Sequence, residues 1–174
     1  MSNNNNRDPK GVPLFHLIFS TGLGTGYVPV APGTAGAFLA LVIWYVLYLL
    51  ISPAALLWTT IGLILFTTVA GAWTSNVMER YWGEDPRTVV IDEFVGTWIP
   101  LLVANVINPW HTAILAFFGF AAFRLIDIFK PLGCRWVDRN IHGGWGVMLD
   151  DVLAGTYALI LTLLFRHLCF QPLF

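Results

Sequence analysis

The sequence predicts an all-α membrane protein, a compact bundle of about four to five transmembrane helices with a re-entrant or interfacial N-terminal segment. Two observations predict this fold class. No Asp, Glu, Lys or Arg occurs between Gly11 and Met78. Charged residues make up 11% of the chain, against about 25% in soluble domains, and hydrophobic residues make up 57%. The net charge of −1 gives no basic surface, so we expect no nucleic-acid partner.

The chain length predicts one domain. We expect a single integral-membrane domain over residues 12–170. Residues 1–11 form a polar, Asn-rich tail, which we expect to be disordered. This tail lacks the basic-then-apolar order of a cleaved signal peptide.

Five apolar segments predict the helices of the bundle. About 20 apolar residues span a bilayer, so the first, second, fourth and fifth segments are long enough. The third has only about 16 residues, or roughly 24 Å of helix, which places the acids at its start close to membrane depth. A further stretch, Val12–Phe19, is too short to span and is expected to lie along the interface. The five segments are Thr34–Ile51, Ala54–Ser75, Asp92–Ile107, His111–Lys130 and Leu149–Leu168.

The distribution of charge predicts which side of the membrane each helix end faces. Helices joined by short turns alternate in direction, so the first, third and fifth segments start on the side where the second and fourth end. Lys and Arg gather on that side, with Arg166 the exception, and this bias makes the side cytoplasmic. All 10 acidic residues lie on or near it. Polar loops do not explain the ionisable residues inside apolar segments, where charge is costly and usually functional.

A glycine-rich loop, Gly22–Gly36, precedes the first long segment. Its glycines permit close approach of the backbone to a ligand, and Thr34 is a candidate N-cap. Free N–H groups at a helix start favour an anion, so Gly33 and Thr34 are candidate phosphate-binding residues. The alternative is a tight re-entrant turn without a ligand. The loop lacks the Gly-Lys-Ser/Thr ending of a Walker sequence.

Acidic pairs open two of the predicted helices. Asp92 and Glu93 begin the third segment, where the helix dipole favours negative charge, and capping is the alternative explanation. Capping needs one acid, whereas two neighbouring acids repel each other unless a cation is near. Asp150 and Asp151 repeat the arrangement after a glycine-rich turn. Together with Asp127 they predict an oxygen-rich site that suits a hard cation such as Mg²⁺.

Basic side chains accompany these acids. Arg124, Asp127 and Lys130 recur at three-residue spacing near a helix end, so they share a broad face. An ion-pair ladder is one explanation, and cations that bind a phosphate are the other. Arg139 and His142, in the loop before the second acidic pair, are further candidates for substrate binding, and His142 is also a candidate proton carrier. A predicted metal site, basic side chains that suit a phosphate and a position in the membrane together suggest hydrolysis of a lipid phosphate.

Four motifs in this order resemble those of the phosphatidylglycerophosphatase A family. The resemblance covers about Phe15 to Tyr157 and implies a phosphatase that removes phosphate from phosphatidylglycerophosphate to give phosphatidylglycerol in phospholipid biosynthesis. It also implies Mg²⁺ as cofactor and the bacterial inner membrane as location. The motifs are G-Y-V-P-V-A-P-G-T-A-G, V-I-D-E-F-V-G, F-R-L-I-D-I-F-K-P and H-G-G-W-G-V-M-L-D-D-V-L-A-G. The site residues that the resemblance points to are Asp92, Glu93, Arg124, Asp127, Lys130, Asp150 and Asp151.

The expected mechanism is metal-assisted hydrolysis at the cytoplasmic face. One or two Mg²⁺ ions would orient the phosphate and activate a water, and Arg124 and Lys130 would neutralise phosphoryl oxygens. An aspartyl-phosphate route remains an alternative, and so does a different class of protein, an ion-coupled transporter whose buried acids carry a cation. A non-enzymatic scaffold would leave the paired acids unexplained. The expected metal ligands are Asp92, Glu93, Asp127, Asp150 and Asp151, and all of these except Glu93 are also the catalytic candidates.

Overall fold

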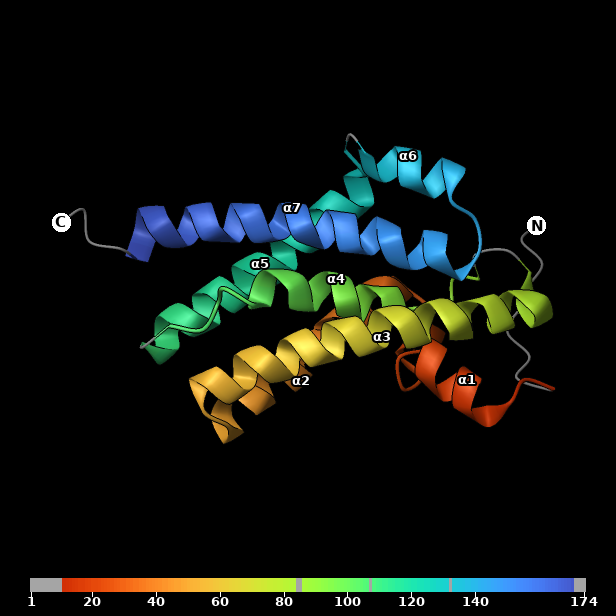
Figure 1. Cartoon of the computed structure of the whole chain (residues 1–174), viewed down its shortest axis with the longest axis horizontal. Coiled ribbons are helices and arrows are strands. Elements are labelled where there is room, and N and C mark those ends of the chain that lie inside the picture. The colour runs from red at the N-terminus through yellow and green to blue at the C-terminus, as the bar shows by residue number, and fades with distance from the viewer. Residues whose placement is uncertain (1–10, 84–85, 107, 132, 171–174) are drawn as a thin grey trace.

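The computed structural model describes residues 11–83, 86–106, 108–131 and 133–170, and within these ranges every regular element is a helix (Figure 1). The predicted disordered tail therefore lies outside the described residues, apart from Gly11. The all-α fold class is confirmed. The elements are α1 (Leu14–Ser20), the 3-10 turn η2 (Thr25–Tyr27), α2 (Pro32–Leu50), α3 (Pro53–Trp82), α4 (Ile91–Leu101), α5 (Pro109–Phe129), α6 (Gly133–Asn140) and α7 (Gly144–Phe170).

Four helices, α2, α3, α5 and α7, are long and apolar enough to cross a membrane. They correspond to the four segments that were predicted to span. Local chemistry sets where two of them begin. Ser52 caps α3 by accepting a hydrogen bond from the Ala55 N–H at 3.4 Å, and Asn108 caps α5 by accepting from the Trp110 N–H at 2.9 Å. Each cap is followed by a proline, whose missing N–H costs nothing in the first turn.

Several element boundaries differ from the prediction, and one helix was not predicted. α7 begins at Gly144 rather than near Leu149, so Asp150 and Asp151 lie beyond its first turn and do not open the helix as predicted. α3 continues past Ser75 to Trp82, so its last turns carry charged side chains. α4 ends at Leu101 rather than near Ile107, and Pro100 in its last turn cannot donate a backbone hydrogen bond. The loop after Pro131 contains α6, an element that was not predicted. A short polar helix of this kind lacks the long apolar run on which the predictions depended.

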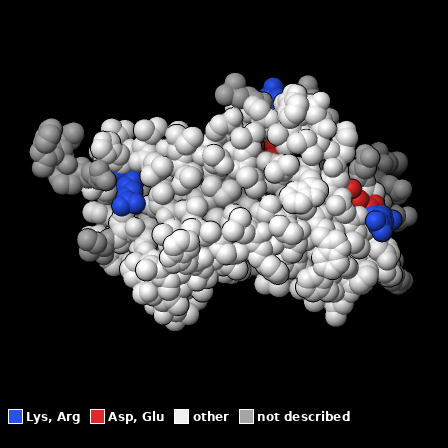
Figure 2. All heavy atoms as spheres, viewed as in Figure 1, with Lys and Arg blue, Asp and Glu red and all other residues white. Residues whose placement is uncertain are grey.

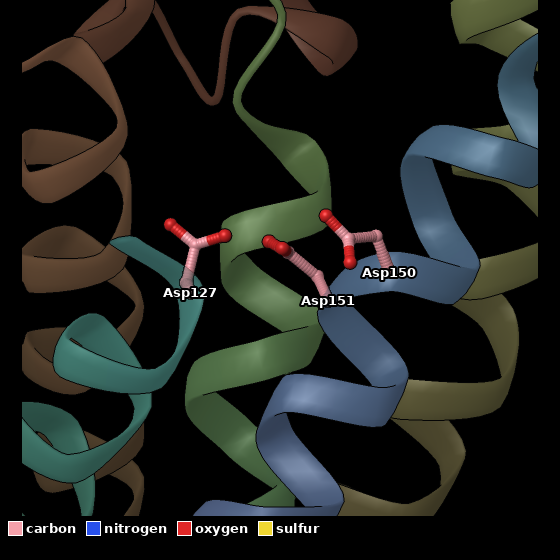
Figure 3. Close-up of side chains that lie close together, drawn as sticks. All are labelled: Asp127, Asp150 and Asp151. Atoms are coloured by element: carbon pink, nitrogen blue, oxygen red, sulfur yellow. The ribbon is translucent and has the colours of Figure 1, made fainter. Parts of the chain in front are cut away.

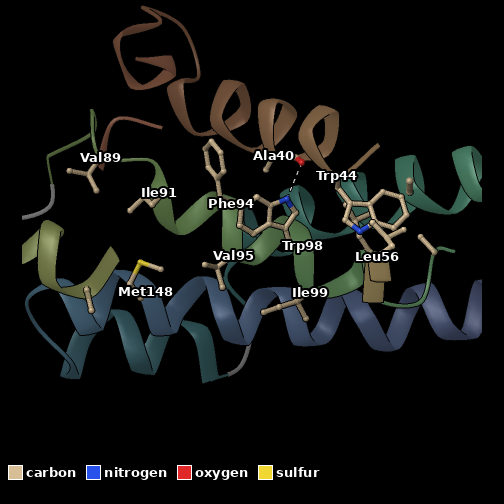
Figure 4. Close-up of a cluster of buried hydrophobic side chains, with 14 of the residues drawn as sticks. Ala40, Trp44, Leu56, Val89, Ile91, Phe94, Val95, Trp98, Ile99 and Met148 are labelled. Carbon is tan, nitrogen blue, oxygen red and sulfur yellow. Dashed lines mark hydrogen bonds between the residues drawn. The ribbon is translucent and has the colours of Figure 1, made fainter. Parts of the chain in front are cut away.

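The short helix α4 lies at the centre of the bundle. It packs against α2, α3, α5 and α7, and ten of its residues are buried. Figure 4 shows its Trp98 ring in the core, where the indole N–H donates to the Ala40 carbonyl of α2 at 3.0 Å. On the other side α4 meets α7 closely, because a Cβ added to Gly155 would lie 2.7 Å from the Gly96 carbonyl oxygen. The acidic pair at the start of α4, Asp92 and Glu93, is therefore carried by a helix that four other helices hold in place.

The outer surface of the bundle is apolar. Large hydrophobic side chains are exposed along the long helices, among them Trp58, Phe66, Phe117 and Leu164. The face shown in Figure 2 is almost entirely uncharged. Such a surface is aggregation-prone in water but is well solvated by lipid chains. The exposed faces of the long helices thus support the membrane character that the composition predicts.

Candidate active site

A cavity of about 630 Å³ lies at the end of the bundle where α2, α4 and α7 begin and where α3 and α5 end. Helices that alternate in direction bring these five ends together, as the sequence predicted. The lining residues are Ala31, Pro32, Gly33, Glu79, Arg87, Val89, Val90, Asp92, Glu93, Arg124, Asp127, Lys130, Ile141, His142, Gly143, Gly146, Val147, Asp150 and Asp151.

This cavity gathers nine of the eleven predicted site residues. Thr34 is not among the lining residues, and the side chain of Arg139, on α6, lies outside the described part of the structure. The nine are Gly33, Asp92, Glu93, Arg124, Asp127, Lys130, His142, Asp150 and Asp151.

Three carboxylates converge inside the cavity. Asp127 comes from α5, while Asp150 and Asp151 come from α7, and one oxygen of each lies within 4.8 Å of the other two (Figure 3). Asp150 and Asp151 are only 5% and 3% exposed. Oδ2 of Asp151 is buried and has no hydrogen-bond partner among the described residues. A buried carboxylate oxygen in this state is costly unless a cation or proton donor reaches it.

Arg124 is held between two acids. Its guanidinium forms a close ion pair with Glu93 of α4, and Nη1 lies 3.1 Å from Oδ2 of Asp127 on its own helix. Gly33 explains why α2 can lie against this pair, because a Cβ at that position would collide with the Glu93 carboxylate. Glu93 therefore contacts a basic side chain, and it is not one of the three acids whose oxygens converge.

Lys130 connects the ends of α5 and α7. It follows the last residue of α5 in a left-handed conformation with a φ of 44°, which is uncommon for a residue with a side chain. Its Nζ lies 2.5 Å from Oδ2 of Asp150. The predicted ion-pair ladder along α5 is thus present only in part. Arg124 and Asp127 pair within the helix, while Lys130 contacts an acid of α7.

The glycine turn before α7 is held against α3. The Gly144 N–H donates to Oδ1 of Asn76 at 2.7 Å, and Gly143 has a φ of 75°, in the left-handed region that favours glycine. A Cβ on Gly144 would collide with the Ala72 carbonyl. The structure shows close approach to a neighbouring helix, which fixes the start of the helix that carries two of the acids.

The predicted N-cap at the start of α2 is wrong. The helix begins at Pro32, and Ala31 occupies the N-cap position with a φ of 51° and no side-chain hydrogen bond. Thr34 lies within the first turn, where its side chain cannot cap. Proline is favoured at the first helical position because its missing N–H has no partner there in any case. Pro32 was therefore the better signal.

Sequence reasoning missed three residues near the cavity. Glu79 and Arg87 line it, and Asn76 supports it through Gly144. Asn76 and Glu79 lie beyond the predicted end of the second apolar segment, and only the continued helical spacing could have indicated them. Arg87 lies in the connection between α3 and α4, whose path no local pattern determines.

Cys134 of α6 is a free, buried thiol close to the cavity. Burial raises the pKa of this thiol, and the negative charge of Asp150 raises it further. A thiol is a nucleophile mainly as the thiolate, and a raised pKa disfavours that form at neutral pH.

The fold and the cavity define a class of protein. It is an α-helical membrane protein with a cavity at its helix ends that is lined by carboxylates and basic side chains. A sequence model described as phosphatidylglycerophosphatase A matches residues 18–166. The chain belongs to the phosphatidylglycerophosphatase A family. It is accordingly an enzyme, a phosphoric monoester hydrolase.

Three curated relatives accompany this family match. The phosphatidylglycerophosphatase A of Escherichia coli is 36% identical over 81% of this chain and 77% of its own length. That of Haemophilus influenzae is 31% identical over 87% of this chain and 88% of its own. A protein of Bacteroides thetaiotaomicron named "Putative phosphatidylinositol-3-phosphatase" is 52% identical over 83% of this chain and 89% of its own. No solved structure matches the chain.

Proposed function

We propose that this enzyme is a Mg²⁺-dependent phosphatase that hydrolyses phosphatidylglycerophosphate to phosphatidylglycerol and phosphate. One observation carries the proposal. Asp127, Asp150 and Asp151 converge in a cavity that also contains basic groups, at one end of a bundle of apolar helices. The substrate follows from the names of the relatives from E. coli and H. influenzae.

The residues present fit Mg²⁺. This ion takes hard oxygen ligands, usually from one or two carboxylates with water and substrate phosphate completing the shell. The three converging carboxylates provide such oxygens, and Oδ2 of Asp151 is buried without a hydrogen-bond donor. Asp127, Asp150 and Asp151 would hold the ion, with Asp92 as a further acid on the same cavity wall. When bound, Mg²⁺ supplies positive charge to the phosphoryl oxygens and lowers the pKa of water.

The basic residues would bind and orient the phosphate. Arg124 is fixed by its contacts with Glu93 and Asp127, so its guanidinium needs little reorganisation when a phosphate arrives. Lys130 brings a second positive charge beside Asp150. The Gly33 N–H, in the first turn of α2, adds a donor at the cavity wall. His142, at the exposed edge of the cavity, is placed to carry a proton to the leaving alcohol.

The attack on phosphorus has two candidate nucleophiles, a water and one of the aspartates. A water held near the acids would give phosphate in one step. An aspartate would first form an acyl-phosphate that a second water then hydrolyses. The burial of Asp150 and Asp151 favours roles as ligands, because their carboxylates lie against protein on most sides.

An ion-coupled transporter is the alternative function, and it has less support. A transporter needs a cation path that reaches both faces of the membrane. The acids of the described residues instead line a single cavity at one end of the bundle. The family match supports the phosphatase.

We place the enzyme in the bacterial inner membrane with its cavity facing the cytoplasm. Two relatives are bacterial proteins with the phosphatase name. The Lys/Arg bias assigns the cavity end to the cytoplasmic side. A phosphatase with this orientation would act on lipid in the cytoplasmic leaflet. The acids of the cavity lie at the helix ends on that side.

Phosphatidylinositol 3-phosphate is a second candidate substrate, because the Bacteroides relative carries that activity in its name. The cavity volume of about 630 Å³ falls in the usual range for ligand sites, so volume alone does not reject the larger headgroup. The two lipids share a phosphate monoester and differ in the alcohol that leaves.

Phosphate release by the purified enzyme in detergent micelles tests the proposal. Phosphatidylglycerophosphate and phosphatidylinositol 3-phosphate are compared by kcat/KM, each with Mg²⁺, with EDTA, and with EDTA followed by excess Mg²⁺. We expect phosphatidylglycerophosphate to be preferred, chelation to abolish turnover and Mg²⁺ to restore it. Full turnover after chelation would overturn the metal assignment, and a preference for the inositol lipid would overturn the substrate.

A further inference from the structure

A second cavity lies at the opposite end of the bundle from the acids. Its volume is about 450 Å³, and it is formed where α3 and α5 begin and where α7 ends. None of the described residues that line it is acidic. The lining residues are Pro53, Asn105, Val106, Asn108, His111, Arg166 and Phe170.

Arg166 gives this cavity its charge. The side chain is half-buried, and Nη1 donates to the Val103 carbonyl at 3.0 Å, which holds the guanidinium against the chain that follows α4. A guanidinium has five N–H donors and no acceptor, and a carbonyl supplies no negative charge. The interaction with Val103 therefore orients Arg166 without neutralising it.

Arg166 lies on a helix that is long and apolar enough to span a membrane, where a charge is costly. It follows Asp151 on α7 by 15 residues, or roughly 22 Å of helix, which is shorter than the thickness of about 30 Å of a hydrocarbon core. An arginine at this depth requires a partner in the protein or in the lipid. In Figure 2 the end of the visible face near the C-terminus shows basic atoms and no acidic atoms.

The other polar groups of the cavity favour an anion. Oδ1 of Asn108 accepts from the Trp110 N–H, so its amide nitrogen is the end that can donate. The His111 ring lies against Phe170 with centroids 4.3 Å apart, which fixes the imidazole at the cavity wall. Asn105 adds a second amide. Arginine, amide and imidazole N–H groups around one space are the donors that a phosphate accepts.

We propose that this cavity binds the phosphate group of a phospholipid in the leaflet opposite the active site, with Arg166 as its principal contact. Inorganic phosphate shares the same chemistry and is the other source of such an anion. The lipid is favoured because the cavity lies at the end of spanning helices and is walled in part by Pro53, Val106 and Phe170, which suit the glycerol and acyl region. The inference is independent of the substrate proposed for the active site.

The test measures the thermal unfolding midpoint of the delipidated enzyme in detergent. The probes are short-chain phosphatidylglycerol, the matching diacylglycerol, which lacks phosphate, and inorganic phosphate. Because phosphatidylglycerol and phosphate could also bind the active site, wild type is compared with Arg166→Gln and with Arg124→Gln, the same change in the active-site cavity. We expect phosphatidylglycerol to stabilise wild type and Arg124→Gln, and this stabilisation to be smaller in Arg166→Gln than in either of them. Arg166→Lys should retain part of it.

Two outcomes would overturn the proposal. Equal stabilisation of wild type and Arg166→Gln by phosphatidylglycerol would show that Arg166 does not bind the lipid. Stabilisation of wild type by diacylglycerol equal to that by phosphatidylglycerol would show that the phosphate is not recognised. Stabilisation through Arg166 by inorganic phosphate alone would overturn the lipid as ligand. If Arg166→Gln does not fold, native mass spectrometry of wild type and Asn105→Leu takes its place. Loss of a bound phospholipid in Asn105→Leu is then the expected result, and an unchanged lipid count contradicts the proposal.

Discussion

At the scale of single residues, the cavity sorts its acids into two groups. Asp127, Asp150 and Asp151 bring oxygens together, whereas Glu93 lies against Arg124. Asp92 and Glu93 occupy successive helix positions, about 100° apart, and it is Glu93 that forms the ion pair with Arg124. Asp127 of α5 meets Asp150 and Asp151 of α7, and the next two predictions follow from the division between convergent and paired acids.

The convergent acids should be essential. We expect Asp127→Asn and Asp151→Asn each to lower phosphatase activity by at least about 10²-fold, because each change removes a charge and keeps the side-chain size. Glu84→Gln is the matched acid-to-amide control, at a position outside the motifs and outside the described residues, and should have little effect. Activity is measured beside the amount of folded protein in the membrane. Normal hydrolysis by well-folded Asp127→Asn and Asp151→Asn would show that these acids are structural.

The contact between Glu93 and Arg124 should be measurable as a coupling free energy in a double-mutant cycle. We expect Glu93→Gln and Arg124→Gln each to lower the free energy of unfolding, and the double variant to lose less than the sum, by about 0.5–3 kcal/mol. The reason is that either single change leaves a partly buried group without its partner. Unfolding in denaturant-containing micelles measures all four proteins. Additive losses of unfolding free energy would show that the pair contributes little to stability. Separately, we expect Arg124→Lys to lower the activity, because lysine lacks the planar guanidinium that can bind phosphate through two N–H groups.

At the scale of elements, close packing of α4 against α7 positions the acids of both helices. Gly96 and Gly155 allow this approach, and neither glycine was singled out for it by the sequence motifs. A helix that is too short to span is stabilised here by burial on all sides rather than by its own hydrogen bonds. The position of Asp92 and Glu93 relative to Asp150 and Asp151 therefore depends on a contact of small residues in the middle of the bundle.

Gly155→Ala should force these two helices apart. Its Cβ would lie 2.7 Å from the Gly96 carbonyl oxygen, and overpacking of this kind costs about 1–3 kcal/mol. We therefore expect a lower unfolding midpoint and reduced activity. Gly62→Ala in α3 is the control, since nothing lies within 4 Å of its added Cβ and alanine is the better helix former. Equal midpoints for the two variants would show that α4 and α7 can separate without cost.

At the scale of the whole molecule, charge separates along the helix axes. The described acids lie at one end of the bundle and Arg166 at the other, with apolar helix surface between them. Alternating helix direction causes this separation, because five helix ends with charged flanks are brought to the same face. The arrangement fixes the orientation of the molecule in a membrane once the sidedness of any one loop is known.

That sidedness can be measured with single cysteines at Arg87 and Arg135, both exposed, in a background without Cys134 and Cys169. We expect an impermeant maleimide to label neither position in intact spheroplasts and both after lysis, because the Lys/Arg bias places this end in the cytoplasm. Labelling after lysis shows that the positions are reactive. Labelling of either before lysis would reverse the orientation and with it the leaflet proposed for the second cavity.

The sequence by itself determined the fold class, the spanning helices and most of the charged residues of the cavity. It could do so because spanning a bilayer requires long apolar runs, and because charge inside such runs is too costly to be retained without a function. The same reasoning did not predict the residues at which individual helices begin and end. Pro32 rather than Thr34 starts α2, and α3 continues to Trp82, since local chemistry and packing decide the last turns.

Only the tertiary structure decided which charged groups meet. The pairing of Glu93 with Arg124, the contact of Lys130 with Asp150 and the hydrogen bond from Gly144 to Asn76 each join residues on different helices. Their sequence positions carry no signal for these contacts, because the rotation and depth of each helix are set by side chains packed throughout the bundle. The cavity around Arg166 has the same origin. It depends on where the start of α5 and the end of α7 come to lie, which is a property of the packed helices and not of either segment.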